Sequence, residues 1–218
     1  MPYFNIVAET SENTVVTEYE PVKKRSDSYQ SEAALEQEFI RLLCEQGYEY
    51  LPIHTEKDLI ANLRKKLEEL NNYRFSDTEW DDFFKNAVAN PNEHIVEKTR
   101  TIQEDNVKNL KRDNGKTKNI TLIDKKNIYN NRLQVINQYK VNAAAENGAK
   151  HDNRYDVTVL VNGLPLVHIE LKRRGVAIRE AFNQINRYQR DSFWAGCGLY
   201  EYIQIFVISN GTNTKYYS

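Results

Sequence analysis

Two apolar runs on either side of Asn162-Gly163 constrain the fold of this chain more than any other feature of its sequence. They lie in residues 155–172, which read YDVTVLVNGLPLVHIELK. An Asn-Gly pair between such runs is the strongest short-range signal for a hairpin, because both residues accept the positive φ angles of a tight turn. The segment therefore predicts two adjacent antiparallel strands.

The rest of the chain divides into an earlier, mostly helical part and a later part of mixed character. Apolar residues recur at helical spacing in the first hundred residues, and β-branched, alternating segments follow. The predicted helices are 31–46, 55–71, 76–90, 93–103 and 176–190; the further predicted strands are 119–124, 132–141 and 202–209, and 142–152 is predicted to be a loop. This order predicts one α/β domain over residues 1–218. A helical part at about 28–105 precedes a core at about 119–210, in which helices flank a mixed β-sheet.

Composition excludes several classes of protein. The chain has 218 residues, enough to bury a core, and its formal net charge of −1 provides no overall basic field for nucleic acid. Cys44 and Cys197 are too few for a disulfide scaffold or a cysteine zinc site. The first eleven residues lack the pattern of a signal peptide, and no run approaches 18 apolar residues. We therefore expect a cytoplasmic protein with no membrane span.

Asp156, Glu170 and Lys172 form the sharpest candidate for a catalytic site. Glu170 and Lys172 project from the same face of one predicted strand, since strand side chains alternate. Two converging carboxylates can hold a hard divalent cation such as Mg²⁺, and a lysine beside them can position a water. Such a set suits metal-assisted hydrolysis of a phosphodiester. Taken alone, Glu-x-Lys is more often an ordinary charged strand end.

The register of the hairpin tests this candidate. With a plain two-residue loop and regular pairing, Asp156 would lie opposite Ile169 and point away from Glu170. A three-residue loop, or one β-bulge, places Asp156 opposite Glu170 instead. We predict the irregular register.

The next helix adds a second pair, Gln184 and Tyr188, which share one helix face at i, i+4. Both side chains can contact phosphate, sugar or bases, although Tyr188 could equally belong to the core. Residues 170–190 contain six Lys or Arg and two Glu, a local surplus that suits a polyanion. The candidate DNA contacts from this segment, besides Gln184 and Tyr188, are Arg173, Arg174 and Arg187.

The first helix offers two further carboxylates, and other motifs are set aside. Glu32 falls within the apolar arc of its helix and Glu36 at the flank, although glutamates near a helix N-terminus also have an ordinary stabilising role. Gly115-Lys116-Thr117 lacks the preceding glycine and strand of a phosphate loop, so we interpret it as a surface turn. The four histidines lack zinc-site spacing; His168 could border the Glu170 site, although a structural role is the more common one.

Residues 154–188, RYDVTVLVNGLPLVHIELKRRGVAIREAFNQINRY, strongly resemble the nuclease segment of the restriction (R, or HsdR) subunit of type I restriction–modification enzymes. The likeness is closest to the IC-type branch. Four further segments resemble the same family: DSYQSEAALEQEFIRLLCEQGYEY (27–50), LIDKKN (122–127), LQVINQ (133–138) and IFVISNGTNT (205–214). The resemblance therefore covers nearly the whole chain.

This resemblance implies a PD-(D/E)xK restriction-endonuclease-like core that cleaves double-stranded DNA with Mg²⁺. It assigns Asp156 and Glu170, with the Leu171 carbonyl, to the metal, and Lys172 to catalysis. Gln184 and Tyr188 match the Q-x-x-x-Y motif of RecB-like nucleases, which is thought to contact DNA. Tyr155 stands where the motif name has Pro, a departure that the family often shows.

The family also implies a larger machine. Complete R subunits continue into a helicase-like motor that uses ATP to translocate DNA, and they work with methyltransferase and specificity subunits. No phosphate-binding loop is present in these 218 residues, so we expect an N-terminal nuclease fragment. Two alternatives stay open: a free-standing PD-(D/E)xK repair nuclease, and a docking domain of the R subunit that does not cleave.

Overall fold

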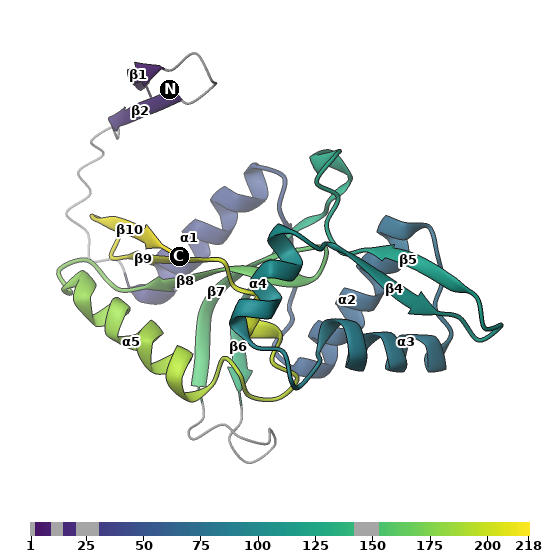
Figure 1. Cartoon of the computed structure of the whole chain (residues 1–218). Helices are drawn as coiled ribbons and strands as arrows, with labels where there is room; N and C mark the ends of the chain where they lie inside the picture. Colours follow the sequence, from purple (N-terminus) through teal and green to yellow (C-terminus); the bar gives the residue numbers. More distant parts are fainter. Residues whose placement is uncertain (1–2, 10–14, 21–30, 142–152) are drawn as a thin grey trace.

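The computed structural model describes residues 3–9, 15–20, 31–141 and 153–218, and its centre is a six-stranded mixed sheet (Figure 1). The strand order is β10-β9-β8-β7-β6-β3, with parallel pairs at β8/β9 and β3/β6. The sheet strands are β3 (Glu49–Tyr50), β6 (Leu133–Val141), β7 (Asn153–Val161), β8 (Leu164–Leu171), β9 (Ile205–Ser209) and β10 (Thr214–Tyr217). The mixed α/β class expected from the sequence is confirmed.

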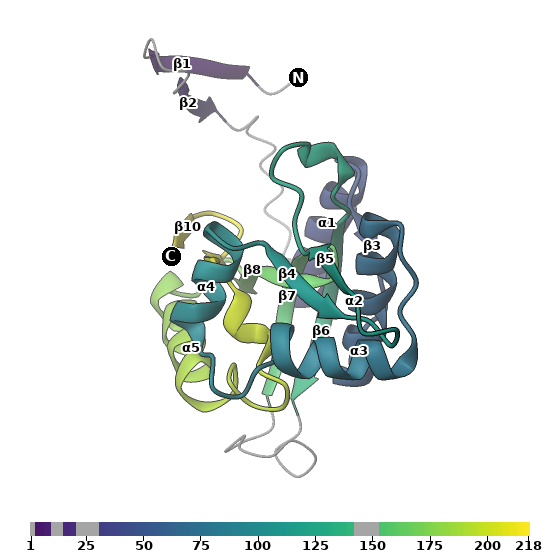
Figure 2. The same cartoon turned by 45° about the vertical axis from the view of Figure 1, so that its right-hand side comes forward.

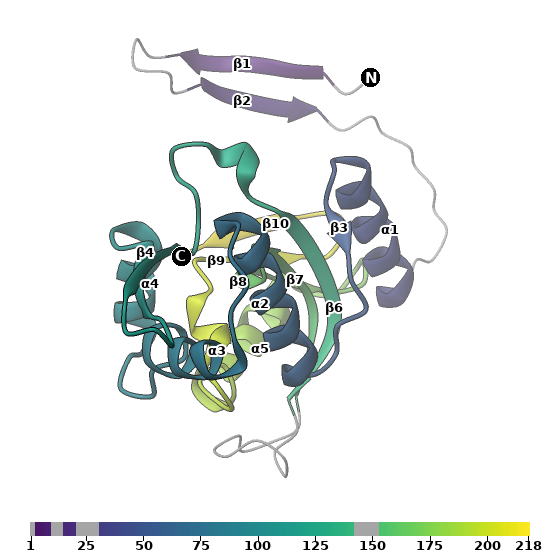
Figure 3. The ribbon, with the colours of Figure 1, turned by 90° about the vertical axis from the view of Figure 1, so that its right-hand side faces the viewer.

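Helices cover both faces of this sheet. They are α1 (Glu32–Glu45), α2 (Glu56–Asn71), α3 (Asp77–Phe83), α4 (Ile95–Gln103) and α5 (Ile178–Asp191). Helix α1 lies on one side, while α2, α4 and α5 lie on the other (Figure 3). The α1 side has a small apolar cluster that includes Val135, Val157 and Ile169, whereas the opposite side holds the larger core.

Two hairpins lie outside the main sheet. Strands β4 (Val107–Lys111) and β5 (Thr117–Thr121) pair antiparallel and lie against α2 and α3 (Figure 2). Strands β1 (Tyr3–Glu9) and β2 (Val15–Glu20) form a separate antiparallel pair. Gly115 occupies the β4–β5 turn with a φ of +77°, in agreement with the surface turn predicted there.

The hairpin β7–β8 has the irregular register that the sequence predicts. Val161 pairs with Leu164 across the Asn162-Gly163 turn, and Val159 pairs with Val167, so one extra residue of β8 is accommodated between these pairs. The bulge shifts the remaining ladder so that Val157 faces Ile169. Asp156 is consequently brought opposite Glu170.

The predicted helices are confirmed with small shifts at their ends, and Ser76 and Glu79 form the predicted capping box. The third helix ends in a π-helical turn at Phe84–Val88, closed by a hydrogen bond of 2.7 Å from the Ala89 N–H to the Phe84 carbonyl. Predicted strand 202–209 is wrong over its first residues, since a 3₁₀ turn occupies Leu199–Tyr202. The sequence analysis also missed strands β1, β2, β3, β4 and β10, and predicted loop 142–152 lies outside the described residues.

Membrane insertion finds no support in the part of the chain that the structure describes. Each helix there is too short or too polar to span a bilayer.

Gly163 provides a test of this packing. Its φ is +87°, and a Cβ at this position would lie 2.6 Å from the Leu63 Cα of α2. We expect Gly163→Ala to lower the free energy of unfolding by about 2–4 kcal/mol, the sum of left-handed strain and backbone collision. Gly115→Ala is the matched control, because Gly115 has a φ of +77° and open space around it. Equal losses for both variants in urea denaturation would contradict the close contact between the turn and α2.

Candidate active site

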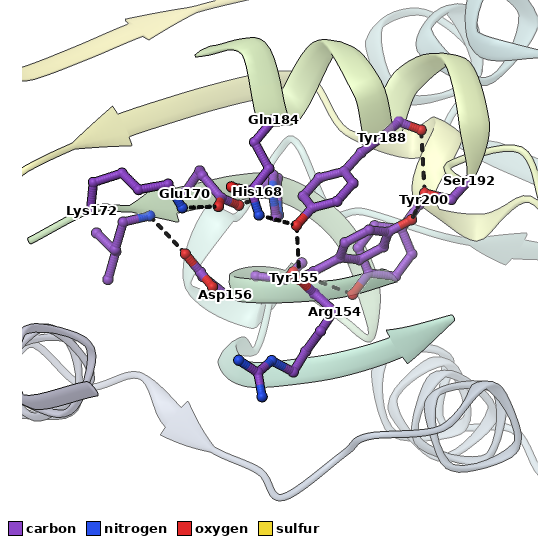
Figure 4. Close-up of polar contacts among 12 residues, drawn as sticks. Arg154, Tyr155, Asp156, His168, Glu170, Lys172, Gln184, Tyr188, Ser192 and Tyr200 are labelled. Atoms are coloured by element: carbon purple, nitrogen blue, oxygen red, sulfur yellow. Dashed lines mark hydrogen bonds and ion pairs between the residues drawn. The ribbon is translucent and has the colours of Figure 1, made fainter. Parts of the chain in front are cut away.

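The three residues of the predicted catalytic set meet where β7 begins and β8 ends (Figure 4). The Lys172 Nζ donates to Glu170 Oε1 at 2.8 Å. The Leu171 backbone N–H donates to Asp156 Oδ2 at 2.9 Å, which ties the Asp156 side chain to the strand that carries Glu170. The bulged register is the cause of this convergence, because regular pairing would turn Asp156 away.

Burial and the short distances between these charged groups shift the pKa values of Asp156 and Lys172. The Glu170 side chain has no solvent exposure, and its Oε2 has no hydrogen-bond partner in the described part of the chain. Burial, and next the negative charge of Glu170, raise the pKa of Asp156 to about 7. Burial acts to lower the pKa of Lys172, but the attraction and hydrogen bond of Glu170 outweigh it and leave that pKa raised. Lys172 is therefore an ammonium at neutral pH.

His168 borders the site, as the sequence analysis allowed. Its Nε2 lies 3.6 Å from Glu170 Oε2, and neither ring nitrogen has a hydrogen-bond partner among the described residues. The ring packs edge-on against Tyr155, Tyr188 and Phe193 with centroid separations of 5.5–5.9 Å. An aromatic wall thus closes one side of the Glu170 carboxylate to water.

Gln184 and Tyr188 of α5 contact one another above this wall (Figure 4). The Gln184 amide donates to the Tyr188 hydroxyl, which in turn donates to the Arg154 carbonyl at 2.9 Å. Tyr188 is only 1% exposed, so its ring belongs to the core, and burial followed by the charge of Glu170 raises its pKa to about 12. Gln184 is half-buried and lies at the border of the site.

The arginines named as candidate DNA contacts are exposed. Arg173 and Arg174 follow directly after Lys172, and Arg187 lies on α5 with its guanidinium 5.3 Å from the Tyr188 ring centroid. They form the cationic border of a site whose centre is acidic.

The expectation for the carboxylates of α1 was wrong in one respect, because the structure buries Glu36 and not Glu32. Glu32 is exposed and accepts a hydrogen bond from the Arg173 backbone N–H at 3.2 Å. Glu36 is 7% exposed and accepts from the side-chain amides of Asn137 and Gln138. The helical wheel missed this because it assigns apolar faces and cannot register amide donors on a facing strand.

Asn137 and Gln138 are the residues near the site that sequence reasoning did not identify. Gln138 has a φ of +54° within β6, a left-handed backbone that is uncommon for this residue type. No pattern in the sequence indicates that conformation, because Gln carries none of the enrichment that Asn or Gly has in such positions.

The donor chemistry fits a hard divalent cation. Asp156 and Glu170 provide carboxylate oxygens, and the buried Glu170 Oε2 forms no hydrogen bond within the described ranges. Among the described residues, no three His, Cys, Asp or Glu side chains are grouped closely enough to hold a metal by themselves. Mg²⁺ does not require that, because it typically takes one or two carboxylates and keeps several waters.

Comparison with known proteins identifies the family. Residues 29–218 match the family model described as "Type I restriction enzyme R protein N terminus". The chain is 49% identical over 213 residues to the "Type I restriction enzyme EcoprrI endonuclease subunit" of Escherichia coli, an alignment that covers 97% of this chain and 66% of that protein.

A second relative is the "Type I restriction enzyme SsaAORF53P endonuclease subunit" of Staphylococcus saprophyticus, 40% identical over 195 residues. That alignment covers 87% of this chain and 20% of the relative. The chain therefore spans about two thirds of the first relative and one fifth of the second. On the extent of the family match, the chain belongs to the family of type I restriction enzyme R protein N-terminal regions.

Proposed function

We propose that this chain is the Mg²⁺-dependent endonuclease part of a type I restriction enzyme R subunit, with a PD-(D/E)xK core that cleaves double-stranded DNA. The observation that carries this proposal is the meeting of Asp156, Glu170 and Lys172 where β7 begins and β8 ends. A β-bulge in the hairpin brings Asp156 opposite Glu170, whereas regular pairing would turn Asp156 to the other face. Both relatives are named as endonuclease subunits, which supports the same activity.

In this proposal Asp156 and Glu170, with the Leu171 carbonyl, hold the cation. A bound Mg²⁺ would polarise the scissile phosphate and lower the pKa of a coordinated water. The raised pKa of Lys172 makes it a hydrogen-bond donor and not a base at neutral pH. Its ammonium would therefore orient the attacking water and offset the negative charge that develops on the phosphate.

The surrounding residues would hold DNA beside this centre. Gln184 would contact the backbone or a base edge, while buried Tyr188 fixes the Gln184 amide by hydrogen bonding. Arg173, Arg174 and Arg187 would attract phosphates to the border of the site. The acidic centre and basic border together reconcile the near-zero net charge with a polyanionic substrate.

The assembly and the motor are part of the same proposal. In full length, the subunit would carry an ATP-dependent DNA-translocating motor and work with methyltransferase and specificity subunits. Sustained grip on DNA would then belong to those parts, and the described chain would supply cleavage.

Lys172→Ala tests the catalytic assignment. In a complex reconstituted from the full-length subunit with its modification and specificity subunits, we expect plasmid cleavage to fall by at least about 100-fold. ATP hydrolysis and the thermal unfolding temperature should stay close to those of the unchanged protein. Lys126→Ala, at an exposed position of the loop before β6, is the control and should cleave normally. Undiminished cleavage by Lys172→Ala would favour a docking role without catalysis.

Asp156→Asn tests the electrostatics of the site in metal-free buffer. The carboxyl has a pKa of about 7 when folded against 3.8 as an ordinary value, so the folded state binds more protons than the unfolded state between these limits. Ionised Asp156 therefore lowers stability as pH rises from about 4 to 7, and the asparagine removes this loss.

We expect Asp156→Asn to be more stable than the unchanged protein by roughly 1–4 kcal/mol at pH 8, with the difference vanishing towards pH 3. Urea denaturation with EDTA at several pH values measures it. Asp81→Asn, exposed on α3, is the control and should change stability by less than about 0.5 kcal/mol. Destabilisation by Asp156→Asn at pH 8 would contradict a repulsive carboxylate pair.

A further inference from the structure

In both β6 and β7, the alternation of side chains between the two faces of the sheet is interrupted next to the candidate site. Ile136 and Tyr139 of β6 both face the larger core although they are three positions apart, which regular alternation does not permit. On β7, Tyr155 and Leu160 belong to that same core although they are five positions apart. The pairs Asn137–Val157 and Tyr139–Tyr155 enclose the irregular position, so Gln138 lies across from Asp156.

The left-handed backbone of Gln138 has a visible consequence for Glu36. Consecutive strand residues normally point to opposite faces, yet Asn137 and Gln138 both direct their amides to the α1 side. Asn137 Nδ2 donates to Glu36 Oε1, and Gln138 Nε2 donates to Glu36 Oε2. A φ of +54° at Gln138 is what allows two neighbouring side chains to hold the two oxygens of one carboxylate.

Asn137 is itself held in place. Its side-chain Oδ1 accepts from the Tyr50 hydroxyl at 3.0 Å, and its carbonyl lies 3.0 Å from His54 Nδ1. The amide that reaches Glu36 is thus fixed from a second direction. Strain of this kind persists where surrounding contacts over-determine the backbone, and it is concentrated at functional sites.

Glu36 is held by neutral groups only. No Lys, Arg or His forms an ion pair with it in the described part of the chain, so its two amide partners satisfy the carboxylate without neutralising it. Its negative charge acts on Asp156 and contributes to raising the pKa of that carboxyl. The site therefore holds Asp156 and Glu170 beside Lys172, with Glu36 as a further carboxylate whose charge acts on Asp156.

This arrangement has an excess of negative charge, which a divalent cation would offset. When Asp156 is ionised, Asp156 and Glu170 exceed the single ammonium of Lys172 by one negative charge, Glu36 adds to that excess, and the Glu170 Oε2 has no hydrogen-bond partner among the described residues. If position 36 served stability alone, a hydrophobic residue or a carboxylate paired with a cation would destabilise the fold less than this unneutralised carboxylate does. Side chains outside the inner ligand set commonly tune a bound cation in this way.

We propose that Asn137 and Gln138 are positioning residues that fix Glu36 as an outer carboxylate of the cation site. Glu36 acts there through its charge and through waters of the cation, not as a direct ligand. This inference rests on the proposed function, because it requires a divalent cation between Asp156 and Glu170.

Gln138→Gly separates this role from a purely structural one. Glycine adopts a positive φ without strain, and this relief offsets part of the stability that is lost when Glu36 Oε2 loses its amide donor. We expect Mn²⁺ affinity, measured on the protein by isothermal titration calorimetry, to fall by about 10-fold. Gln138→Asn also tolerates the left-handed backbone but is one methylene too short, and it should show the same loss. Asn72→Gly, an exposed left-handed position with a φ of 44° at the end of α2, should leave Mn²⁺ affinity unchanged.

The outcomes are distinct. Unchanged Mn²⁺ affinity in both Gln138 variants, or affinity that falls only in step with thermal stability, would overturn the positioning role. Glu170→Gln should abolish Mn²⁺ binding; if it does and the Gln138 variants bind normally, only this inference fails. Unaltered binding by Glu170→Gln, or no binding by the unchanged protein, would overturn the cation site and this inference together.

Discussion

Burial of the Glu170 carboxylate next to Asp156 is the constraint on which the rest of this structure depends. The Glu170 side chain is fully removed from water, and Lys172 is the one cation that pairs with it closely within the described residues. Taking a carboxylate out of water costs several kcal/mol unless charge and hydrogen bonds compensate. A second carboxylate opposite it adds repulsion, so the core must be rigid enough to hold both in place.

Irregular backbone positions in neighbouring strands fix the side chains around these carboxylates. The β8 bulge brings Asp156 opposite Glu170, and the left-handed Gln138 on β6 turns two amides toward Glu36. Aromatic rings around His168 exclude water from the other face. Each irregularity costs stability locally, and the apolar packing of α1 and α5 on opposite faces offsets it.

Much of this arrangement could be predicted from the sequence, because the register of a hairpin follows from the numbers of residues in its loop and strands. The Asn162-Gly163 turn and the requirement that Asp156 meet Glu170 were enough to predict an irregular register, by a three-residue loop or by a bulge, and the structure has the bulge. Apolar spacing located the main helices. Sequence reasoning did not reach Gln138, whose backbone angle is set by tertiary contacts, or the burial of Glu36 over Glu32. Short edge strands such as β3 and β10 were missed because two to four residues carry too little periodicity.

The most direct test of a cation site between Asp156 and Glu170 is a crystal structure of the protein soaked in Mn²⁺, with anomalous data. We expect one anomalous peak within about 2.0–2.3 Å of a carboxylate oxygen from each residue, with the remaining positions completed by a carbonyl and waters. Density elsewhere on the surface and none between these two carboxylates, at a Mn²⁺ concentration that supports cleavage, would contradict it.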